Sequence, residues 1–285
     1  MTFNGGPILT LQSRRCARTI EFEAFAWLVE KLRPSWLASS RLYGSADGTG
    51  TDTDQASALN KAISEALERW AFYELAYSPK CADFGFDIDR STSGMAAFPG
   101  ITRIEARERA YLEAVERWGV CAWWEGLIGC NRIDLGDSNL NCFRLRTPFE
   151  KIETVILHRK SKAHCYSFGS GRSLKYALSR ANTELDRNSQ VLDRAYSLAD
   201  AERINFVPIG VYEKRLLFFS TENGFDKFLK RTTESSKLFV RSAKPILIVD
   251  TEVRGAWSKY TFVWRCLFRP TSAMQFSEEA NYFLF

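Results

Sequence analysis

Nearly the same six residues occur twice in this chain, as EALERW at 65–70 and as EAVERW at 113–118. Extended towards the N-terminus, the two copies read AISEALERW (62–70) and AYLEAVERW (110–118), which are identical at six of nine positions. Each copy has two glutamates three residues apart, and the period of an α-helix places such a pair on one face. The sequence therefore predicts two similar helices, each carrying a pair of carboxylates.

Helical spacing of apolar residues extends well beyond the repeated hexamers. It occurs in four segments, which are 17–32, 56–77, 104–126 and 174–198. A shorter amphipathic stretch at 223–231 predicts a surface helix whose basic end faces solvent.

Runs rich in β-branched and aromatic residues predict strands in the second half of the chain. These runs are 154–160, 164–171, 205–212, 244–250 and 259–268. Helices first, followed by strands mixed with helices, favour an α+β fold. Because no linker rich in Pro, Gly or Ser interrupts the chain, we expect one domain over 1–285, with a motif-bearing core at 41–190 and a strand-rich part at 200–285.

Composition excludes several classes of protein. The 285 residues are 45% hydrophobic and 26% charged, which is typical of a soluble globular protein with a large core. A net charge of +5 without a Lys/Arg block suits an anionic ligand but predicts no nucleic-acid partner. Seven scattered cysteines without a CxxC pair indicate a reducing compartment. The chain has no signal-peptide core and no membrane-length apolar run, so we expect a cytoplasmic protein without a membrane partner.

The paired acids lie among large apolar residues such as Trp70, Phe72 and Trp118, so much of the helix surface should be covered. Carboxylates in such surroundings need a cation or a hydrogen-bond donor, and converging acids raise one another's pKa. Mg²⁺ prefers carboxylate oxygens and commonly binds together with phosphates. These residues predict a magnesium–nucleotide site without a P-loop, since GxxxxGK[ST] does not occur. The alternative is that each ExxER is a solvated helix edge with ordinary Glu–Arg pairs.

A weaker copy of the same pattern occurs in the helix predicted at 174–198. There Ala181, Glu184 and Arg187 stand where the first copy has Ala62, Glu65 and Glu68. Segments of small residues precede each of the three helices, at 43–52, 91–100 and 167–173. Such repetition suggests pseudo-symmetric building blocks around a shared centre.

Residues 48–69, 93–118 and 169–184 resemble the YcaO family, and the resemblance covers about residues 41–190. Its members typically read SALxExxER, then SNGxxAGNTxxEAxxxxLxExxER, then ALxRALTExxQ. YcaO proteins bind ATP and Mg²⁺ in a fold of their own and activate a backbone amide carbonyl. The resemblance implies an α+β, YcaO-like fold in which pseudo-symmetric acidic helices pack on mixed or antiparallel sheets.

The resemblance also implies roles for individual residues. Metal binding falls on the two acid pairs and on the acid of the third block, namely Glu65, Glu68, Glu113, Glu116 and Glu184. Nucleotide binding falls on Glu105, Arg180, Lys61 and, through a looser match, Arg15. Of these, Arg180 and Lys61 are also the expected catalytic cations, because each would add positive charge beside the phosphates.

Several positions depart from the family pattern. Ala96 and Ile101 replace a Ser and an Asn that bind the nucleotide, Phe98-Pro99 reads as an insertion, and Arg187 replaces a Gln. The chain ends in EEANYFLF rather than in a proline-rich tail. The acids are kept while neutral polar residues are lost, a pattern that permits metal and phosphate binding but weakens the case for ordinary ATP recognition.

The favoured function is ATP-dependent modification of a ribosomally made peptide, giving azoline rings from Cys, Ser or Thr, or a thioamide. The alternatives are a catalytically weakened partner or scaffold subunit, an accessory factor for ribosomal-protein methylthiolation, and a nucleotide-binding module outside peptide chemistry. We expect a precursor peptide or protein as substrate. A separate leader-binding partner, ubiquitin-activating-enzyme-like or TfuA-like, and a homodimer are also expected. His158 and His164 are predicted to be exposed sheet residues without a catalytic role.

Overall fold

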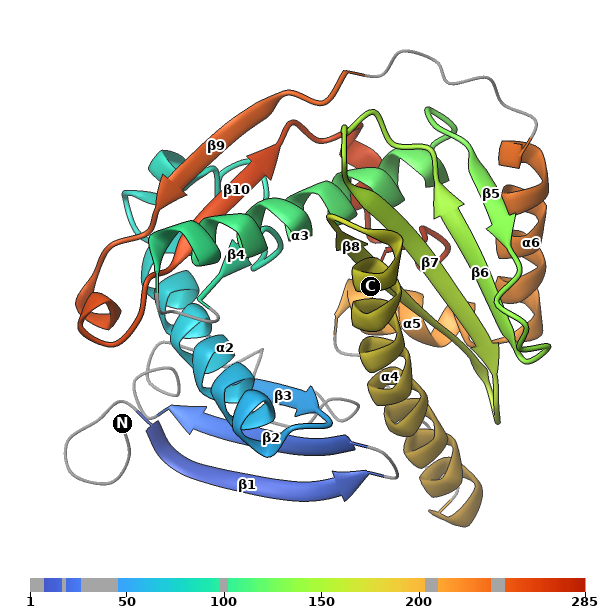
Figure 1. The fold of residues 1–285 in the computed structure, drawn as a ribbon, viewed down its shortest axis with the longest axis horizontal. Coiled ribbons are helices and arrows are strands. Elements are labelled where there is room, and N and C mark those ends of the chain that lie inside the picture. The colour runs from blue at the N-terminus through green and yellow to red at the C-terminus, as the bar shows by residue number, and fades with distance from the viewer. Residues whose placement is uncertain are drawn as a thin grey trace. The chain divides into compact units, whose positions relative to one another are not determined.

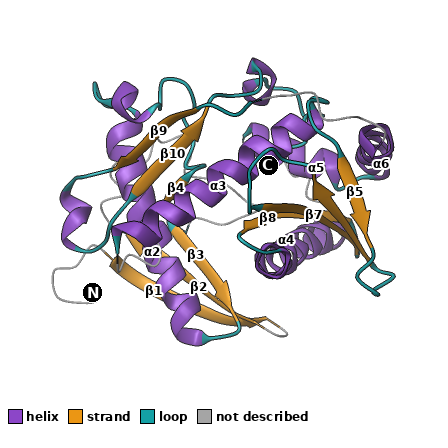
Figure 2. Cartoon of the chain, turned by 45° about the horizontal axis from the view of Figure 1, so that its top comes forward, coloured by secondary structure: helices purple, strands orange, loops and turns teal. Residues whose placement is uncertain are grey.

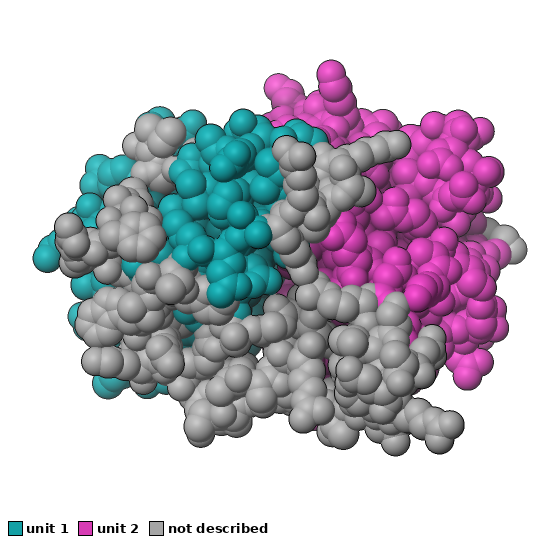
Figure 3. Space-filling model, turned by 90° about the horizontal axis from the view of Figure 1, so that it is seen from below, with its two compact units in different colours: residues 1–39, 45–114, 246–268 teal, residues 40–44, 115–245, 269–285 magenta. Residues whose placement is uncertain are grey.

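The structure is a computed structural model that describes residues 8–16, 19–26, 46–97, 102–202, 210–236 and 244–284. The chain is divided into two units, which are coloured separately in Figure 3. Unit 1 consists of residues 1–39, 45–114 and 246–268, and unit 2 of residues 40–44, 115–245 and 269–285. None of the described helices is both long and apolar enough to cross a membrane.

In unit 1, helix α2 (Gln55–Ala76) packs on a three-stranded antiparallel sheet (Figure 1). The strands β1 (Ile8–Cys16), β2 (Thr19–Ala26) and β3 (Gly48–Asp52) lie in that order. A Cβ atom on Gly50 would collide with the carbonyl oxygen of Ala58. The glycine therefore lets β3 lie directly against the alanine face of the helix.

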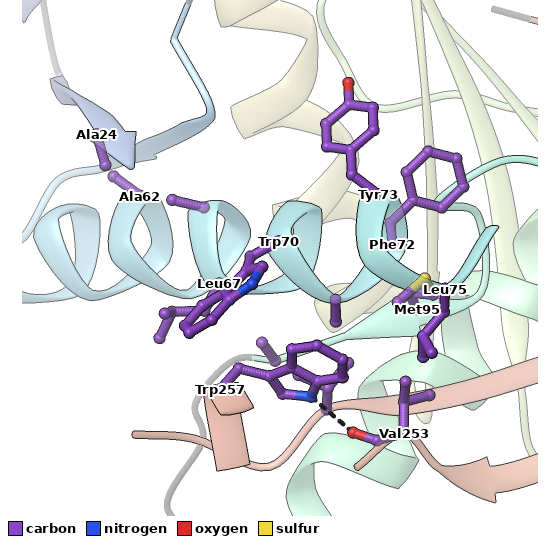
Figure 4. Close-up of a cluster of buried hydrophobic side chains, with 14 of the residues drawn as sticks. Ala24, Ala62, Leu67, Trp70, Phe72, Tyr73, Leu75, Met95, Val253 and Trp257 are labelled. Carbon is purple, nitrogen blue, oxygen red and sulfur yellow. Dashed lines mark hydrogen bonds between the residues drawn. The ribbon is translucent and has the colours of Figure 1, made fainter. Parts of the chain in front are cut away.

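A second antiparallel sheet in unit 1 has the order β4–β10–β9, with bounds Met95–Ala96, Trp264–Phe268 and Leu247–Glu252. Helix α3 (Arg103–Trp124) begins in this unit. The core between α2 and the segment after β9 is aromatic: Trp70 and Trp257 meet edge to face at 5.8 Å, and Trp257 Nε1 donates to Val253 O at 2.8 Å (Figure 4). These contacts bring residues distant in sequence into one hydrophobic cluster.

A buried arginine organises the loop between α2 and β4. Arg265 on β10 is fully buried and donates to the carbonyl oxygens of Phe84 at 2.7 Å, Asp89 at 2.7 Å and Ser91 at 2.8 Å. Its guanidinium also lies 4.1 Å from the centroid of the Phe86 ring. Because buried carbonyls need donors, this single side chain fixes the loop that leads into β4.

Unit 2 is built on a four-stranded antiparallel meander covered on both faces (Figures 1 and 2). Its strands are β5 (Cys130–Ile133), β6 (Leu140–Leu145), β7 (Glu153–Lys160) and β8 (His164–Gly171). Helix α4 (Leu174–Glu202) packs on β7 and β8 through Val155 and Leu157, while α6 (Glu222–Ser236) places Phe228 on the opposite face, against Phe143 and Tyr166.

The segment after β10 completes the second core. Phe283 is fully buried and contacts the rings of Trp124, Phe219 and Phe228, where Phe219 ends the short helix α5 (Val211–Phe219). Arg215 on α5 donates to the carbonyl oxygens of Gln275, Ser277, Glu279 and Leu284. Short 3₁₀ turns at Cys81–Phe84, Ala256–Lys259 and Ala273–Phe276 complete the described elements.

The observed elements confirm most of the predicted ones. The helices predicted at 56–77, 104–126 and 174–198 are α2, α3 and α4, and four predicted strands overlap β7, β8, β9 and β10. The remaining predicted helix, at 17–32, is wrong in its described part, because residues 19–26 form strand β2. The predicted strand at 205–212 is also wrong at its end, since α5 begins at Val211.

After residue 202, the described part of the chain contains the helices α5 and α6 as well as the strands β9 and β10. The amphipathic stretch at 223–231 is helical, as predicted, within the longer α6. Its apolar side is buried in unit 2, and its basic end is not simply solvated, because Arg231 Nε donates to Trp123 O at 2.9 Å.

Candidate functional site

Glu65 is fixed between strand β3 and the next turn of its own helix. Its Oε2 accepts hydrogen bonds from the backbone N–H of Thr49 at 2.9 Å and from Thr49 Oγ1 at 3.1 Å. Its Oε1 lies 3.1 Å from Arg69 Nη2 in an i,i+4 ion pair. The first acid of the repeat is therefore oriented by the small-residue strand that precedes the helix.

Glu113, the corresponding acid of the second copy, is held in a similar way. Its Oε1 accepts from the backbone N–H of Gly94 at 3.2 Å, just before β4. Gly94 has a φ of +74°, and a Cβ there would collide with the carbonyl oxygen of Cys266. In both copies, a glycine-containing segment thus presents a backbone donor to the first glutamate.

The two helices bring three carboxylates together within unit 1. Burial raises the pKa of Glu68 well above its usual value, and the negative charges of Glu113 and then Glu65 raise it further. The Arg69 guanidinium and a backbone N–H of Ala97 act in the opposite direction but do not cancel the rise in pKa. Glu68 therefore ionises less readily than an isolated carboxyl group, and a cation beside it would favour its charged form.

The donor set fits a hard divalent cation, because carboxylate oxygens are the ligands that Mg²⁺ prefers. Within the described parts of the chain, no three His, Cys, Asp or Glu side chains are already arranged as a metal shell. Cation binding at Glu65, Glu68 and Glu113 would therefore require local movement of these side chains. Such a movement would replace the hydrogen bonds that Glu65 accepts from the Thr49 N–H and that Glu113 accepts from the Gly94 N–H.

Lys61 is engaged in an ion pair at the end of β3. Its Nζ lies 2.7 Å from Asp52 Oδ2 and donates to Thr51 O at 3.2 Å. The hydrogen bond and charge of Lys61 help to lower the pKa of Asp52, against the effect of burial. The described side chain thus ties helix to strand, and a role towards phosphate would require it to leave Asp52.

Two predicted site residues of unit 2, Arg180 and Glu184, lie on α4. Arg180 Nη1 donates to Ser170 O at 3.1 Å. Lys61 Nζ makes the same kind of contact to Thr51 O, and in both cases the carbonyl belongs to a residue ten positions earlier. Glu184 Oε2 lies 3.7 Å from Arg187 Nε. Arg187, which replaces the family Gln, therefore supplies a cation to the third-block acid.

Other predicted positions have defined local surroundings. Glu116 lies one turn after Glu113 on α3, in the part of that helix that belongs to unit 2. Glu105 is exposed and forms a reciprocal cap with Thr102, whose Oγ1 donates to Glu105 Oε2 at 2.9 Å and accepts from its backbone N–H at 3.1 Å. The predicted departure Ala96 is a buried residue of β4 paired with Trp264.

Some predicted positions cannot be placed. Arg15 belongs to β1, but its side chain lies outside the described residues, as do Phe98, Pro99 and Ile101. The backbone donors of Thr49, Gly94 and Ala97 were not singled out from the sequence, although the small-residue segments that contain all three were.

The prediction of exposed histidines is wrong. His158 and His164 are 2% and 3% exposed and lie under α6, where both rings stack on Phe225 at 4.5 and 4.1 Å. The flanking Lys and Arg suggested a solvated strand, but the aromatic side of α6 covers this face of the sheet.

Comparison with known proteins gives independent support for the fold. No family model matches the sequence, and no curated protein matches it. Among solved structures, the chain is similar to a YcaO protein from Methanopyrus kandleri that was solved bound with AMPPCP and Mg²⁺. The two proteins are 15% identical, the match covers 91% of this chain and 84% of the other, and the TM-score is 0.55. At this identity the similarity concerns the fold alone, and the chain has the mixed α and β fold of a YcaO protein.

Proposed function

We propose that this chain binds ATP with Mg²⁺ and uses the γ-phosphoryl group to activate a backbone amide of a peptide. The observation that carries the proposal is the grouping of Glu65, Glu68 and Glu113, because burial and the charges of the other two acids raise the pKa of Glu68 and a bound cation would favour its charged form. The similar fold of a YcaO protein solved with an ATP analogue and Mg²⁺ supports Mg²⁺ as the proposed cation.

The acids of the two repeated helices would hold the metal. Glu65, Glu68 and Glu113 form the first group of ligands, and Glu116 and Glu184 are proposed to complete it. Bound Mg²⁺ supplies charge neutralisation to the phosphate oxygens. Positioning and charge neutralisation account for most catalysis of phosphoryl transfer, so no covalent catalyst is required.

The cations and the exposed acid of the family pattern have supporting roles in this proposal. Arg180 and Lys61 would add positive charge beside the phosphates after giving up their present contacts to Ser170 O and Asp52. Glu105 and Arg15 remain proposed contacts to the nucleotide.

The reaction balances without an oxidant or reductant. A thiol, hydroxyl or sulfide adds to the amide carbonyl, and the resulting oxyanion attacks the γ-phosphorus, releasing ADP. Inorganic phosphate then leaves with the former amide oxygen, and loss of a proton gives an azoline or a thioamide. The substrate would be a precursor peptide with Cys, Ser or Thr, presented by a separate leader-binding protein of the ubiquitin-activating-enzyme-like or TfuA-like class.

A second candidate is a subunit that keeps the fold but has weakened catalysis, serving as a partner or scaffold, or assisting ribosomal-protein methylthiolation. The contacts of the predicted cations favour it. Lys61 is paired with Asp52, and Glu184 is paired with Arg187 rather than left for a metal. The two candidates share the fold and differ in turnover.

Calorimetry with Mg²⁺ and AMPPCP, followed by ATP turnover with a candidate peptide, tests the proposal. We expect Glu65→Gln and Glu113→Gln to weaken binding at least tenfold, whereas Glu150→Gln, at an exposed position on unit 2, leaves it unchanged. Tight nucleotide binding without ATP turnover on any of the candidate peptides would support the second candidate. Unchanged affinity in both site variants would overturn the metal assignment.

A further inference from the structure

A continuous line of hydrogen bonds crosses the sheet of unit 2 beneath α6. Arg132 Nη2 donates to Asn141 Oδ1 at 2.9 Å, and Asn141 Nδ2 lies 3.1 Å from His158 Nδ1. His158 Nε2 lies 2.9 Å from His164 Nδ1, and His164 Nε2 lies 3.0 Å from Glu222 Oε2. The line thus joins β5, β6, β7 and β8 to the first residue of α6.

The residues at the two ends of the line fix which atom donates in each of its hydrogen bonds, and the two ends agree. At one end the Glu222 carboxylate can only accept, so His164 carries its proton on Nε2 and its Nδ1 accepts. At the other end Arg132 occupies the Asn141 oxygen, so the Asn141 amide nitrogen donates to His158 Nδ1. His158 Nε2 then donates to His164 Nδ1, and every contact is satisfied only when both rings are neutral with the proton on Nε2.

We propose that this line of hydrogen bonds is an acid-sensitive latch, which holds the first turn of α6 on the sheet at neutral pH and releases it when an imidazole takes up a proton. A protonated His158 would direct an Nδ1–H at the Asn141 amide hydrogens. Turning that amide over would remove the acceptor of Arg132. A proton on the histidine pair therefore breaks at least one contact of the line.

The surroundings of His158 oppose a positive charge on its ring. Burial lowers the pKa of His158 from 6.5 to about 3, with further lowering by His164 and Lys160. The ionisable and charged groups that face the pair are Lys160 on β7, Tyr166 on β8, Glu222 on α6 and, through Asn141, Arg132 on β5. Glu222 offers little compensation, because its exposed carboxylate is also paired with Lys160.

The segment that the latch would release is the first turn of α6. It begins at Glu222 and includes Phe225, whose ring stacks on both imidazoles. One turn later, Phe228 is fully buried among Trp123, Phe143 and Tyr166, which anchor the rest of the helix. Acid should therefore act on residues 222–225 before it acts on the remainder of α6.

Long-range ¹H–¹⁵N spectra and amide exchange of the whole chain test the latch. We expect Nε2–H protonation of both rings at pH 7.5. The protection factors of Gly224 and Phe225, whose amides donate to Thr221, should fall about 30-fold between pH 7.5 and pH 5, from a pKa of about 3 for His158 in the latched state and 6.5 when released. Residues 228–232 should lose much less protection. An Nδ1–H on either ring at pH 7.5, or an equal loss over the whole helix, would overturn the proposal.

A matched pair of variants separates the latch from general surface charge. Asn141→Asp offers His158 Nδ1 an acceptor, so His158 should carry both protons at neutral pH. Asn139→Asp adds the same charge at an exposed position of the loop between β5 and β6 and should leave both rings neutral. A neutral His158 in Asn141→Asp would contradict the inferred direction of the hydrogen bonds.

Discussion

At the scale of single residues, the carboxyl group of Glu68 shows how neighbouring acids oppose one another's ionisation. The charges of Glu113 and Glu65 oppose its ionisation, and burial opposes it more strongly. Glu68→Gln keeps the shape and removes the charge, so we expect the metal-free protein to gain roughly 0.5–2 kcal/mol in its free energy of unfolding. Urea titration in the presence of a chelator would measure this gain.

The control for Glu68→Gln is the same change at Glu150, an exposed position, where the free energy of unfolding should change by less than about 0.5 kcal/mol. A destabilised Glu68→Gln variant would mean that the carboxylate makes a net favourable contact and that the site does not need a cation. The same variant should lose Mg²⁺-dependent nucleotide binding if the proposed function is correct.

His158 makes the stability of the protein depend on pH. Its pKa is about 3 in the folded protein and 6.5 in the unfolded chain, so the unfolded state binds more protons below pH 6.5. The stability that depends on neutral His158 is complete above pH 6.5 and is lost as the pH falls towards 3. Between pH 7.5 and pH 5 this loss amounts to about 2 kcal/mol.

Urea unfolding at those two pH values would reveal the contribution of His158 as the difference between the unmodified protein and His158→Gln. Other groups titrate in both proteins and cancel in the comparison. An identical pH dependence in the two proteins would contradict the lowered pKa. The sequence could not predict this behaviour, because burial of His158 is caused by Phe225 and Phe228, some seventy residues away, and not by its polar strand neighbours.

At the scale of elements, the contact between β3 and α2 depends on having no side chain at Gly50. A Cβ there would meet Ala58 O, an atom of the helix backbone that cannot move alone. We expect Gly50→Ala to separate strand from helix and to lower the free energy of unfolding by about 3 kcal/mol or more. Thermal or urea unfolding of the two proteins would measure the loss.

Gly210→Ala is the matched control, because a Cβ at Gly210 meets no atom within 4 Å. This residue caps α5, so the control should cost no more than about 1 kcal/mol. Since β3 also supplies the Thr49 donors of Glu65, Gly50→Ala should disturb the acid cluster as well. Equal stability of Gly50→Ala and Gly210→Ala would show that the close approach is not required.

Elements whose pattern is local could be predicted, and elements defined by distant partners could not. The acidic helices α2 and α3 have long runs at helical spacing and were predicted within two residues at each end. The segment TIEFEAFA also fits helical spacing, but its alternation matches a strand, and β2 pairs with β1 and β3 on both sides. The short strands β5 and β6 alternate little and contain polar residues, so the sequence does not indicate them.

At the scale of the whole molecule, the three motif blocks predicted a YcaO-like fold. No feature of the sequence predicted the division into two units. Three segments of the chain contribute to each unit, so no linker separates them. The third motif block lies wholly in unit 2, and the first lies in unit 1. Whether all five predicted metal ligands share one centre therefore remains a prediction that binding experiments must test.

Nucleotide selectivity provides such an experiment for the intact protein. Ala96 and Ile101 lack the polar groups that the family pattern has at these positions, and each lost neutral hydrogen bond costs about 0.5–1.5 kcal/mol. Phosphates held by Mg²⁺ and arginine would still bind, so we expect weak discrimination between ATP and GTP and a strong dependence of affinity on Mg²⁺. Calorimetry with each nucleotide, with and without Mg²⁺, would measure both effects. Tight and ATP-selective binding would show that other residues recognise the base, and failure of both nucleotides to bind would favour the scaffold role.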